Sequence, residues 1–299
     1  MSKPSSKMSL DKKHNLTGWI FLTPAALLIL LMSFIPMIQA FLLSFKMGKG
    51  NDLKPAAPIF ANYTRMFTDT VFTQSIKNTF FYLIIQVPIM LVLALILASI
   101  LNNRQLRFKG LFRTMIFLPC ATSLVAYAII FRTLFANDGL VNLVLVNLGI
   151  LSTPYSFLTH ATSAKIIIII GLLWRWTGYN MVFYLSGLQN IEYSVYEAAK
   201  IDGASPVQTF FKITVPLLKP TILLTAIMST NGTLQLFDES VNLTDGGPAN
   251  ASITMSHYIY NMSFKYVPTF GYAAAMSFLI LILVAILAFI QMKVGDKRD

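Results

Sequence analysis

Six long apolar stretches, separated by polar or glycine- and proline-rich segments, constrain this chain more than any other feature of its sequence. A helix that crosses a bilayer needs about twenty mainly apolar residues, and its backbone must satisfy its own hydrogen bonds. Charged residues make up 12% of the chain, against about a quarter in ordinary soluble domains. The sequence therefore predicts an all-α, polytopic membrane protein with six transmembrane helices. The predicted spans are 19–45, 80–101, 111–134, 166–188, 221–237 and 270–292.

The segments around these spans define the predicted organisation. We expect a polar tail at residues 1–16, a six-span domain at 17–293 and a short tail at 294–299. Proline is expected to kink the first span at Pro24 and Pro36. Glycine, proline and polar residues mark the longer connections. The predicted loops are 47–73, 137–164, which contains an amphipathic stretch at 140–148, and 238–268.

The basic residues give a prediction of orientation. The net charge is +11, which in a soluble chain would suggest nucleic-acid binding, but in a membrane protein basic residues gather in the cytoplasmic segments. Both tails and the segments after the second and fourth spans are rich in Lys and Arg, whereas the third and fifth loops carry few. The first loop departs from this pattern. The balance places both termini and the segment after the fourth span in the cytoplasm.

The segment between the fourth and fifth spans, residues 189–219, is polar yet carries strong signals of local order. Ser194 and Glu197 have the spacing of a capping box. Gly203 is placed to end the first short helix in a left-handed conformation. Ser205-Pro206 predicts the start of a second short helix, with an N-cap followed by proline at the first helical position. The segment is therefore expected to be a stiff helix–turn–helix.

The second short helix is expected to end at Val215-Pro216. The segment also carries more apolar surface than so short a piece of chain can bury by itself, which predicts docking to a partner rather than a solvated surface helix. The apolar residues concerned are Tyr193, Val195, Tyr196, Ile201, Val207, Phe210, Phe211 and Ile213.

This segment resembles the EAA loop of the inner-membrane permease subunits of binding-protein-dependent ABC importers. The residues that carry the resemblance, in order and spacing, are Glu197-Ala198-Ala199, Asp202-Gly203-Ala204, Ile213 and Pro216. Residues 187–191 and 243–248 resemble the branch of that family that imports sugars and oligosaccharides, and the likeness extends over residues 19–293. Glu192 departs from the pattern, because that branch usually has proline there.

The resemblance implies a type I ABC importer permease fold and a transport subunit rather than an enzyme. It implies a second homologous permease, two ATPase subunits that bind ATP and Mg, and an extracellular or periplasmic solute-binding protein, with no cofactor in this chain. It also implies a multi-pass location in the bacterial cell (inner) membrane. The residues expected to couple to the ATPase are Glu197, Ala198, Ala199, Asp202, Gly203, Ile213 and Pro216. The turn at Asp245-Gly246-Gly247-Pro248 is either a contact for the binding protein or a plain connector.

Two groups of polar and aromatic residues are candidates for the substrate path. Asn231, Gln235 and Asp238 have the spacing of one helix face in the fifth span, and polar groups at membrane depth must face a cavity or other helices. They either offer hydrogen bonds to sugar hydroxyls or join helices to one another. The second group lies in the fourth span, where aromatic faces either suit sugar rings or pack on lipid and helices. Arg175 either contacts substrate, pairs with Asp238 or Glu239, or extends to the outer interface. Its members are Trp174, Arg175, Trp176, Tyr179 and Asn180.

Three other features limit the alternatives. The chain has no glycine-rich Lys-Ser/Thr phosphate loop, and its three histidines are too far apart in sequence to suggest a metal site. The only cysteine, Cys120, predicts neither an intramolecular disulfide nor a cysteine metal cluster. An ion-gradient-driven secondary transporter remains the alternative to an ABC permease, although no internal repeat is evident. Within the importer reading, the cargo is a sugar or oligosaccharide, with a polyol or a glycerol phosphate diester left open.

Overall fold

The computed structural model of the protein describes residues 10–103 and 105–295, so the predicted tails lie largely outside the described residues. The first half of the described chain comprises α1 (Leu10–Ile29), η1 (Leu30–Phe34), α2 (Ile35–Ser44), β1 (Lys46–Lys49), β2 (Asp52–Pro55), α3 (Ala61–Thr68), α4 (Thr70–Asn102), α5 (Lys109–Ala121), α6 (Leu124–Leu134) and α7 (Leu140–Asn147). The second half comprises α8 (Ala161–Gln189), α9 (Tyr193–Ile201), α10 (Pro206–Thr209), η2 (Phe210–Thr214), α11 (Val215–Leu217), α12 (Lys219–Leu234), η3 (Ser240–Thr244), α13 (Met255–Tyr260), η4 (Asn261–Lys265) and α14 (Phe270–Gly295).

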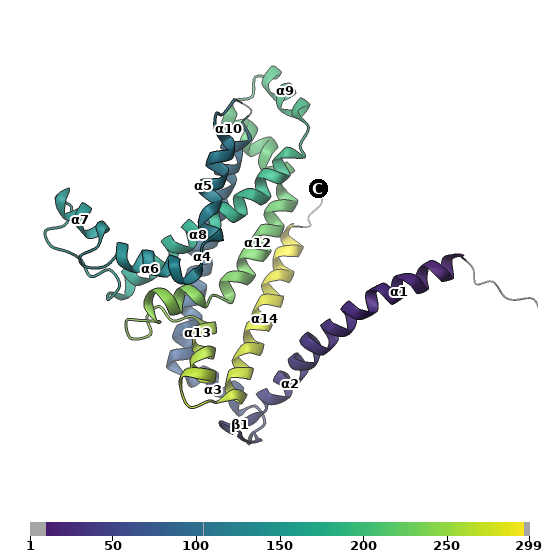
Figure 1. The fold of residues 1–299 in the computed structure, drawn as a ribbon, viewed down its shortest axis with the longest axis vertical. Helices are drawn as coiled ribbons and strands as arrows, with labels where there is room; N and C mark the ends of the chain where they lie inside the picture. The colour runs from purple at the N-terminus through teal and green to yellow at the C-terminus, as the bar shows by residue number, and fades with distance from the viewer. Residues whose placement is uncertain (1–9, 104, 296–299) are drawn as a thin grey trace, which may run out of the picture.

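The long helices α4, α8, α12 and α14 form an elongated body, with α9 and α10 at one end and α3 and the β1–β2 hairpin at the other (Figure 1). Helix α4 packs along α8, and α12 packs against both α4 and α14. Lipid tails are as apolar as leucine, so helices in a membrane associate mainly through close packing. Ala94 and Ala98 of α4 are completely buried and let Met181 and Tyr184 of α8 approach closely. The all-α class is confirmed.

The third predicted span is bent, and a second bend lies just before the fifth. Four helices are long and apolar enough to cross a membrane, and the number of candidate spans among the described residues reaches six only if two bent pairs are included. One pair is Lys109–Ala121 with Leu124–Leu134, bent by 98°, and the other is Pro206–Leu217 with Lys219–Leu234, bent by 70°. The first bend lies where α5 ends, because Thr122, three residues after Pro119, has an extended backbone. The expectation of one continuous helix at 111–134 is wrong.

The first loop contains more regular structure than expected. Strands β1 and β2 pair antiparallel, with Lys49 opposite Asp52 and Gly50 at a positive φ of 58° in the turn. Helix α3 follows, and its Asn62 side chain donates to the carbonyl oxygens of Ser44 and Lys46 at 2.8 Å each. This anchors the loop to the end of α2, so residues 47–73 are not an irregular loop.

Helix α4 starts ten residues before the predicted second span. The carboxylate of Asp69 caps it by accepting hydrogen bonds from the backbone N–H groups of Val71 and Phe72 at 3.0 Å each. Buried residues then recur every three or four positions along the helix, which gives one continuous packed face. These residues include Ser75, Thr79, Tyr82, Gln86, Met90, Ala94, Ala98 and Leu101.

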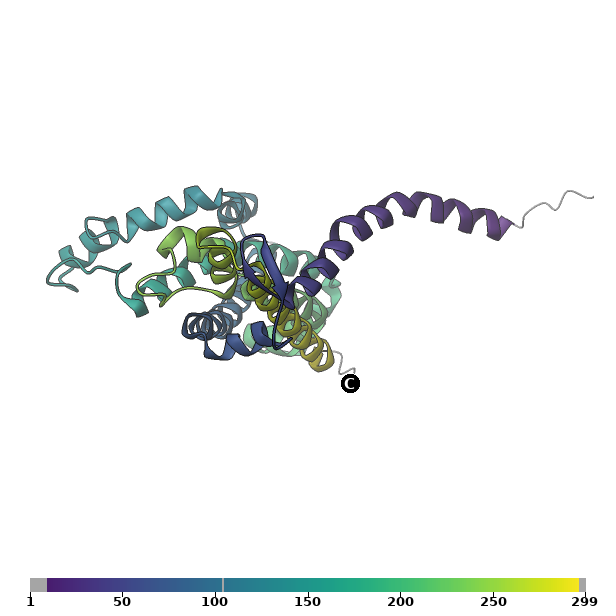
Figure 2. The same ribbon diagram turned by 90° about the horizontal axis from the view of Figure 1, so that it is seen from below.

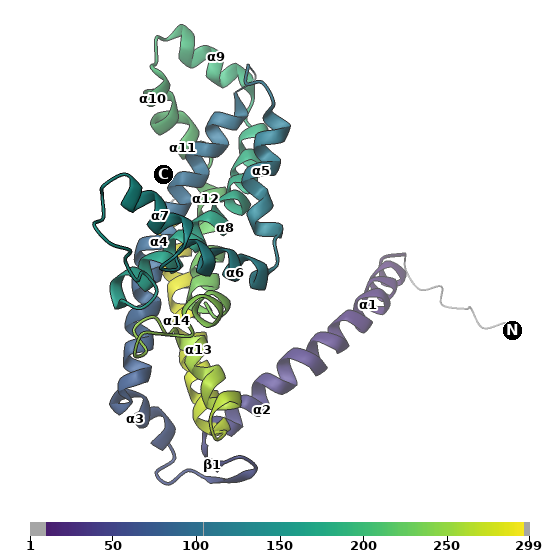
Figure 3. The same cartoon turned by 60° about the vertical axis from the view of Figure 1, so that its left-hand side comes forward.

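The N-terminal helix formed by α1, η1 and α2 leans away from the body in all three views (Figures 1, 2 and 3). Only its α2 end packs on the body, against α14. None of the most apolar window of this helix, within Thr17–Ser44, is buried. A π-helical turn at Leu30–Phe34 precedes Pro36, and the N–H of Ile35 donates to the carbonyl of Leu30. The chain thus accommodates Pro36 by a π turn.

Candidate functional site

The segment 189–219 forms the α9–α11 end of the molecule (Figure 1), and its first helix starts differently from the prediction. The N-cap of α9 is Glu192, which makes no side-chain cap. Ser194 therefore lies inside the first turn of α9, where its hydroxyl donates to the Glu192 carboxylate at 3.3 Å. The capping box predicted between Ser194 and Glu197 is not formed.

The end of α9 follows the prediction in detail. Gly203 has a φ of 74°, a left-handed conformation that side chains other than glycine adopt with strain. The N–H of Ala204 donates to the carbonyl of Ala199 at 2.9 Å, and that of Gly203 donates to Lys200 at 3.2 Å. These two bonds are the Schellman pattern that satisfies the last carbonyl groups of a helix.

The second short helix begins as predicted but continues further. Ser205 and Gln208 form a reciprocal capping box, with Pro206 at the first helical position. The chain then passes through the π turn Phe210–Thr214 and stays helical across Pro216. Because the N–H of Val215 bonds to the carbonyl of Phe210, the π turn admits a proline one residue later. The helix bends at Leu218 and not at Pro216.

The EAA residues differ in what they present to the surroundings. Ala199 is buried, 6% exposed, although it lies on the outermost helix of the segment. Glu197, Ala198, Asp202, Gly203 and Pro216 are exposed, and Ile213 is half-buried. Large apolar side chains surround them, with Ile201 86% exposed and Val207 66% exposed. The segment therefore combines three exposed acids, Glu192, Glu197 and Asp202, with uncovered apolar surface, which favours a protein partner.

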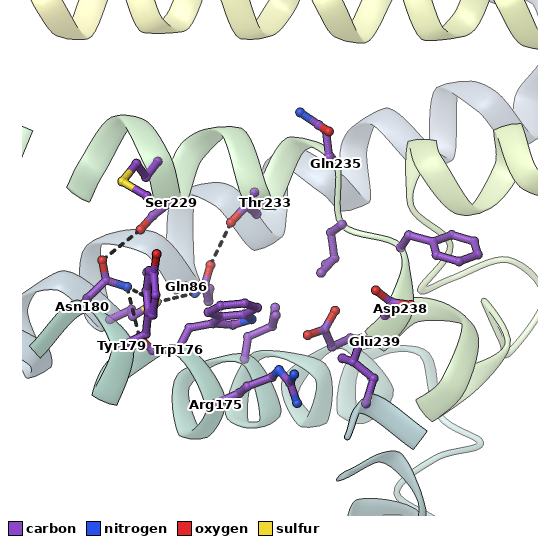
Figure 4. Close-up of a pocket in the computed structure, with 17 residues that line it drawn as sticks. Gln86, Arg175, Trp176, Tyr179, Asn180, Ser229, Thr233, Gln235, Asp238 and Glu239 are labelled. Carbon is purple, nitrogen blue, oxygen red and sulfur yellow. Dashed lines mark hydrogen bonds between the residues drawn. The ribbon is translucent and has the colours of Figure 1, made fainter. Parts of the chain in front are cut away.

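A cavity of about 430 Å³ lies between α4, α8, α12 and the chain that follows α12. Of the predicted substrate-path residues, the structure brings six to its wall: Arg175, Trp176, Tyr179, Asn180, Gln235 and Asp238. Figure 4 shows the α8 side chains facing those of α12 across this space. The two other candidates, Trp174 and Asn231, are not in the wall of the cavity. Trp174 instead stacks on Tyr127, with ring centroids 5.9 Å apart.

Hydrogen bonds tie the polar wall of the cavity together (Figure 4). The Asn180 amide donates to the Trp176 carbonyl at 3.0 Å and accepts from the Ser229 hydroxyl at 3.4 Å. The Thr233 hydroxyl donates to the Gln86 amide oxygen at 3.1 Å. The aromatic part is a Trp176–Tyr179 pair, edge to face with centroids 5.7 Å apart.

Sequence reasoning missed several residues of this wall. Ser229 and Thr233 are four residues apart on α12, and Gln86 interrupts an otherwise apolar span. The sequence could have identified these three residues, because a polar residue at membrane depth needs a polar neighbour. Glu239 also lines the cavity and is only 4% exposed. The sequence suggests Glu239 only as an ion-pair partner for Arg175.

The predicted polar face of the fifth span forms only in part. Helix α12 ends at Leu234, so Asp238 lies beyond the helix and does not share a face with Asn231. The side chains of Asn231 and Gln235 are hydrogen-bonded to each other and exposed. The chain leaves the helix because Leu236 inserts into a buried cluster and its carbonyl accepts from the Thr254 hydroxyl.

Arg175 is buried, 7% exposed, without the predicted ion pair. Within the described residues, no carboxylate oxygen of Asp238 or Glu239 lies within 4.0 Å of its guanidinium. Its Nη1 instead donates to the carbonyl of Thr122 at 3.0 Å. That carbonyl is free for this contact because it lies at the break between α5 and α6.

The turn at Asp245-Gly246-Gly247-Pro248 belongs to a firmly held loop. The Asn78 amide of α4 donates to the carbonyl of Ile253 at 2.9 Å, and Asp245 pairs with Lys265 at 3.0 Å. His257 Nε2 lies 3.6 Å from the Asp245 carboxylate, and His257 Nδ1 is hydrogen-bonded to the Ser240 hydroxyl at 2.9 Å. Burial lowers the pKa of His257 to about 4, so the imidazole is neutral at pH 7.

Comparisons with known proteins agree with this arrangement. Residues 90–296 match the family described as "Binding-protein-dependent transport system inner membrane component". The chain is 49% identical over 296 residues to the lactose transport system permease protein LacF of Rhizobium radiobacter, covering 98% of this chain and 99% of LacF. It is 30% identical to the arabinooligosaccharides transport system permease protein AraP of Halalkalibacterium halodurans, covering 99% and 94%. A chain of a bacterial ABC transporter involved in the import of the acidic polysaccharide alginate superposes with a TM-score of 0.84 at 22% identity, covering 96% and 98%.

Proposed function

The chain belongs to the family of binding-protein-dependent transport system inner membrane components, and on this premise we propose that it carries a sugar or oligosaccharide into the cell. Members of this family are transport subunits of ABC importers and not enzymes; the ATPase activity lies in a partner subunit. Family membership also removes the ion-gradient-driven alternative. The observation that carries the proposal is the aromatic and amide-lined cavity between α4, α8 and α12.

The chemistry of the cavity suits a sugar. Sugar rings present apolar C–H faces that pack on aromatic rings, and the Trp176–Tyr179 pair offers such surface. Their hydroxyls need donors and acceptors together, which Asn180 and Gln86 supply through amide groups. The relatives named for lactose and arabinooligosaccharides support this cargo class over a phosphorylated one. Among the described residues of the wall, Arg175 is the only basic side chain, and it shares the wall with the acids Asp238 and Glu239.

We propose that the EAA segment docks on the ATPase subunit through Glu197, Ala198, Asp202 and Gly203. Its exposed acids and apolar side chains support this role. The segment continues directly into α12 through the 70° bend at Leu218. A rotation of α9–α11 on the ATPase would therefore move Ser229 and Thr233 at the cavity wall. Such coupling needs different contacts for the segment in the two states of the transporter.

The proposed orientation places the α9–α11 end and both termini in the cytoplasm of a bacterial cell. The distribution of Lys and Arg supports it. The opposite end, with the β1–β2 hairpin and the firmly held loop around Asp245, then faces outward. We propose that this outer end receives the solute-binding protein.

A second, homologous permease is the partner that we propose for the uncovered N-terminal helix. The helix leans away from the body and has no buried residue in its apolar window (Figure 3). A neighbouring permease would cover one side of it, and lipid the other. The assembly that we propose has two permeases, two ATPase subunits that bind ATP and Mg, and one binding protein.

Affinity co-purification from membranes, combined with uptake in proteoliposomes, tests this function. The wild-type chain should bring down an ATPase and a second permease, and the assembly should take up labelled lactose or an arabinooligosaccharide only with ATP inside. Glu197→Lys should lose the ATPase and keep the permease. The matched control is Asp52→Lys, an equal charge reversal at the exposed hairpin on the other end. Uptake that survives ATP depletion, or equal loss of the co-purified ATPase in both variants, would refute the proposal.

A further inference from the structure

A second cavity, of about 580 Å³, lies at the α9 end of the molecule. It is formed by the end of α4, the start of α5, the end of α8 and the first residues of the EAA segment. It does not share a lining residue with the cavity beside Trp176. Pockets of roughly 300–1,000 Å³ are the usual size for a small-molecule ligand.

Among the described residues, the charged side chains that line this cavity are all basic. Lys109 and Arg113 line it from one face of α5, since they are four residues apart. No Asp or Glu is among the described residues of the lining, and neither cation forms an ion pair with a described carboxylate. Most basic side chains at a membrane surface extend into water, but these two are half-buried.

The guanidinium of Arg113 has few hydrogen-bond partners for a group whose Nε is buried. Its Nη2 makes one long contact, 3.4 Å, to the carbonyl of Leu101. Its Nε is buried and has no hydrogen-bond partner among the described residues. Buried polar groups are nearly always paired, so an unpaired one inside a polar cavity points to a missing acceptor. Carboxylate or phosphate oxygens fit the planar fork of arginine best.

The neutral groups around the two cations also suit an anion. Asn102 of α4, Gln189 of α8 and Tyr196 of α9 also line the cavity. Tyr196 has one long contact, 3.4 Å, to the hydroxyl of Thr214. Amide N–H and phenolic O–H groups donate readily to anionic oxygens.

We propose that this cavity binds a phosphate-bearing anion, either a small phosphate ester or the headgroup of an anionic phospholipid, through Arg113 and Lys109. The phosphate oxygens would accept from the Arg113 fork, with Lys109 as a second charge and the amides as neutral donors. A ligand here would join α5 to α9, and so join the body to the EAA segment. The inference rests on the proposed function in one respect: it takes this end of the molecule as cytoplasmic.

Binding to the full-length purified permease tests the inference without any transport assay. One arm uses calorimetry to measure the binding of glucose 6-phosphate and of inorganic phosphate to protein that has been stripped of lipid in neutral detergent. The other arm compares nanodiscs of phosphatidylcholine with nanodiscs that contain phosphatidylglycerol, and identifies retained lipid by native mass spectrometry. Saturable binding in the first arm identifies a soluble ester as the source, and selective retention in the second identifies the lipid.

Matched variants decide whether the site is the one described. Removing one charged hydrogen-bond donor should weaken binding on the order of ten- to a hundredfold, so Arg113→Gln should bind at least tenfold more weakly than wild type. Arg107→Gln removes the same charge from the same connection, outside the lining, and should bind like wild type. Arg113→Lys, which keeps the charge but not the fork, should fall between them and shows that loss is not misfolding.

No binding in either arm, or equal weakening by Arg113→Gln and Arg107→Gln, would overturn the inference. Such a result would leave co-purification with the ATPase unaffected. Conversely, failure of the ATPase to co-purify would refute the proposed function while the binding data still stood.

Discussion

The hydrogen bonds of Asp69 predict how much this side chain contributes to the free energy of unfolding. The Asp69 carboxylate caps α4 and also accepts from the hydroxyl groups of Tyr258 on α13, at 2.7 Å, and Tyr272 on α14, at 2.9 Å. The Arg65 guanidinium lies 4.0 Å from the centre of the Tyr272 ring. One half-exposed side chain thus connects three helices at the end of the molecule opposite α9.

Replacing this side chain by Asp69→Ala should cost about 4 kcal/mol in the free energy of unfolding. The estimate takes about 1 kcal/mol for a lost N-cap and about 1.5 kcal/mol for each of the two tyrosine bonds, the low end for charged acceptors. The low end is appropriate because Asp69 is half-exposed and water competes for it. The measurement is unfolding in mixed micelles followed by tryptophan fluorescence, with the exposed Asp52→Ala as the control.

A double-mutant cycle of Asp69→Ala with Tyr258→Phe isolates one of these bonds. The coupling energy should be about 1.5 kcal/mol, because the second substitution has little left to remove. The pH dependence is a further check. Burial raises the pKa of Asp69, but its hydrogen bonds from Phe72, Tyr258, Tyr272 and Val71 outweigh burial and hold the pKa below its ordinary value.

The sign follows from linkage. A carboxyl whose pKa is lower in the folded protein adds stability above its unfolded pKa, near 4, and this stability is lost as the pH falls through the folded pKa. Asp69→Asn should therefore flatten the loss of stability below pH 4. If the two single substitutions change the free energy of unfolding additively, Asp69 and Tyr258 are not coupled. If Asp69→Ala unfolds within about 0.5 kcal/mol of wild type, the Asp69 hydrogen bonds do not stabilise the protein as predicted.

Two further predictions concern packing and protonation. A Cβ on Gly178 would clash with the carbonyl oxygen of Ile116, so Gly178→Val should force α5 from α8 and abolish a monodisperse gel-filtration peak. Gly110→Val, with open space around it, should leave that peak intact. Burial depresses the pKa of His257 to about 4, below about 6.5 in the unfolded chain, so stability should fall as the pH drops from 6.5 toward 4. The loss between pH 7 and 5 should be roughly 2 kcal/mol, measured by the same unfolding assay, and an unchanged slope in His257→Gln would contradict it.

The long helices could be predicted because apolar length alone specifies them. Helices α8 and α14 begin and end within a few residues of the predicted spans. The start of α4 could not be placed this way, since residues 70–79 are polar enough to read as loop. They are helical because Asn78 and Thr79 bond to the loop around Ile253, far away in sequence.

The candidate site shows the same division between local and tertiary information. The end of α9 was predictable because Gly203 and the Ser205–Gln208 pair act within a few residues. The cavity was only partly predictable, because its wall combines α4, α8 and α12. Trp174 and Trp176 look equivalent in the sequence, but one packs on Tyr127 and the other lines the cavity.

The sugar path that we propose is the cavity between α4, α8 and α12. Its most direct test is simultaneous measurement of sugar uptake and ATP hydrolysis by the reconstituted assembly, with Trp176→Ala compared with Trp174→Ala. Losing one aromatic contact with the sugar should slow uptake by roughly tenfold, while hydrolysis stimulated by the binding protein persists. Trp174→Ala should transport at close to the wild-type rate. Wild-type uptake by Trp176→Ala, or an equal loss of uptake in both variants, would show that the sugar does not contact Trp176 on its way through the membrane.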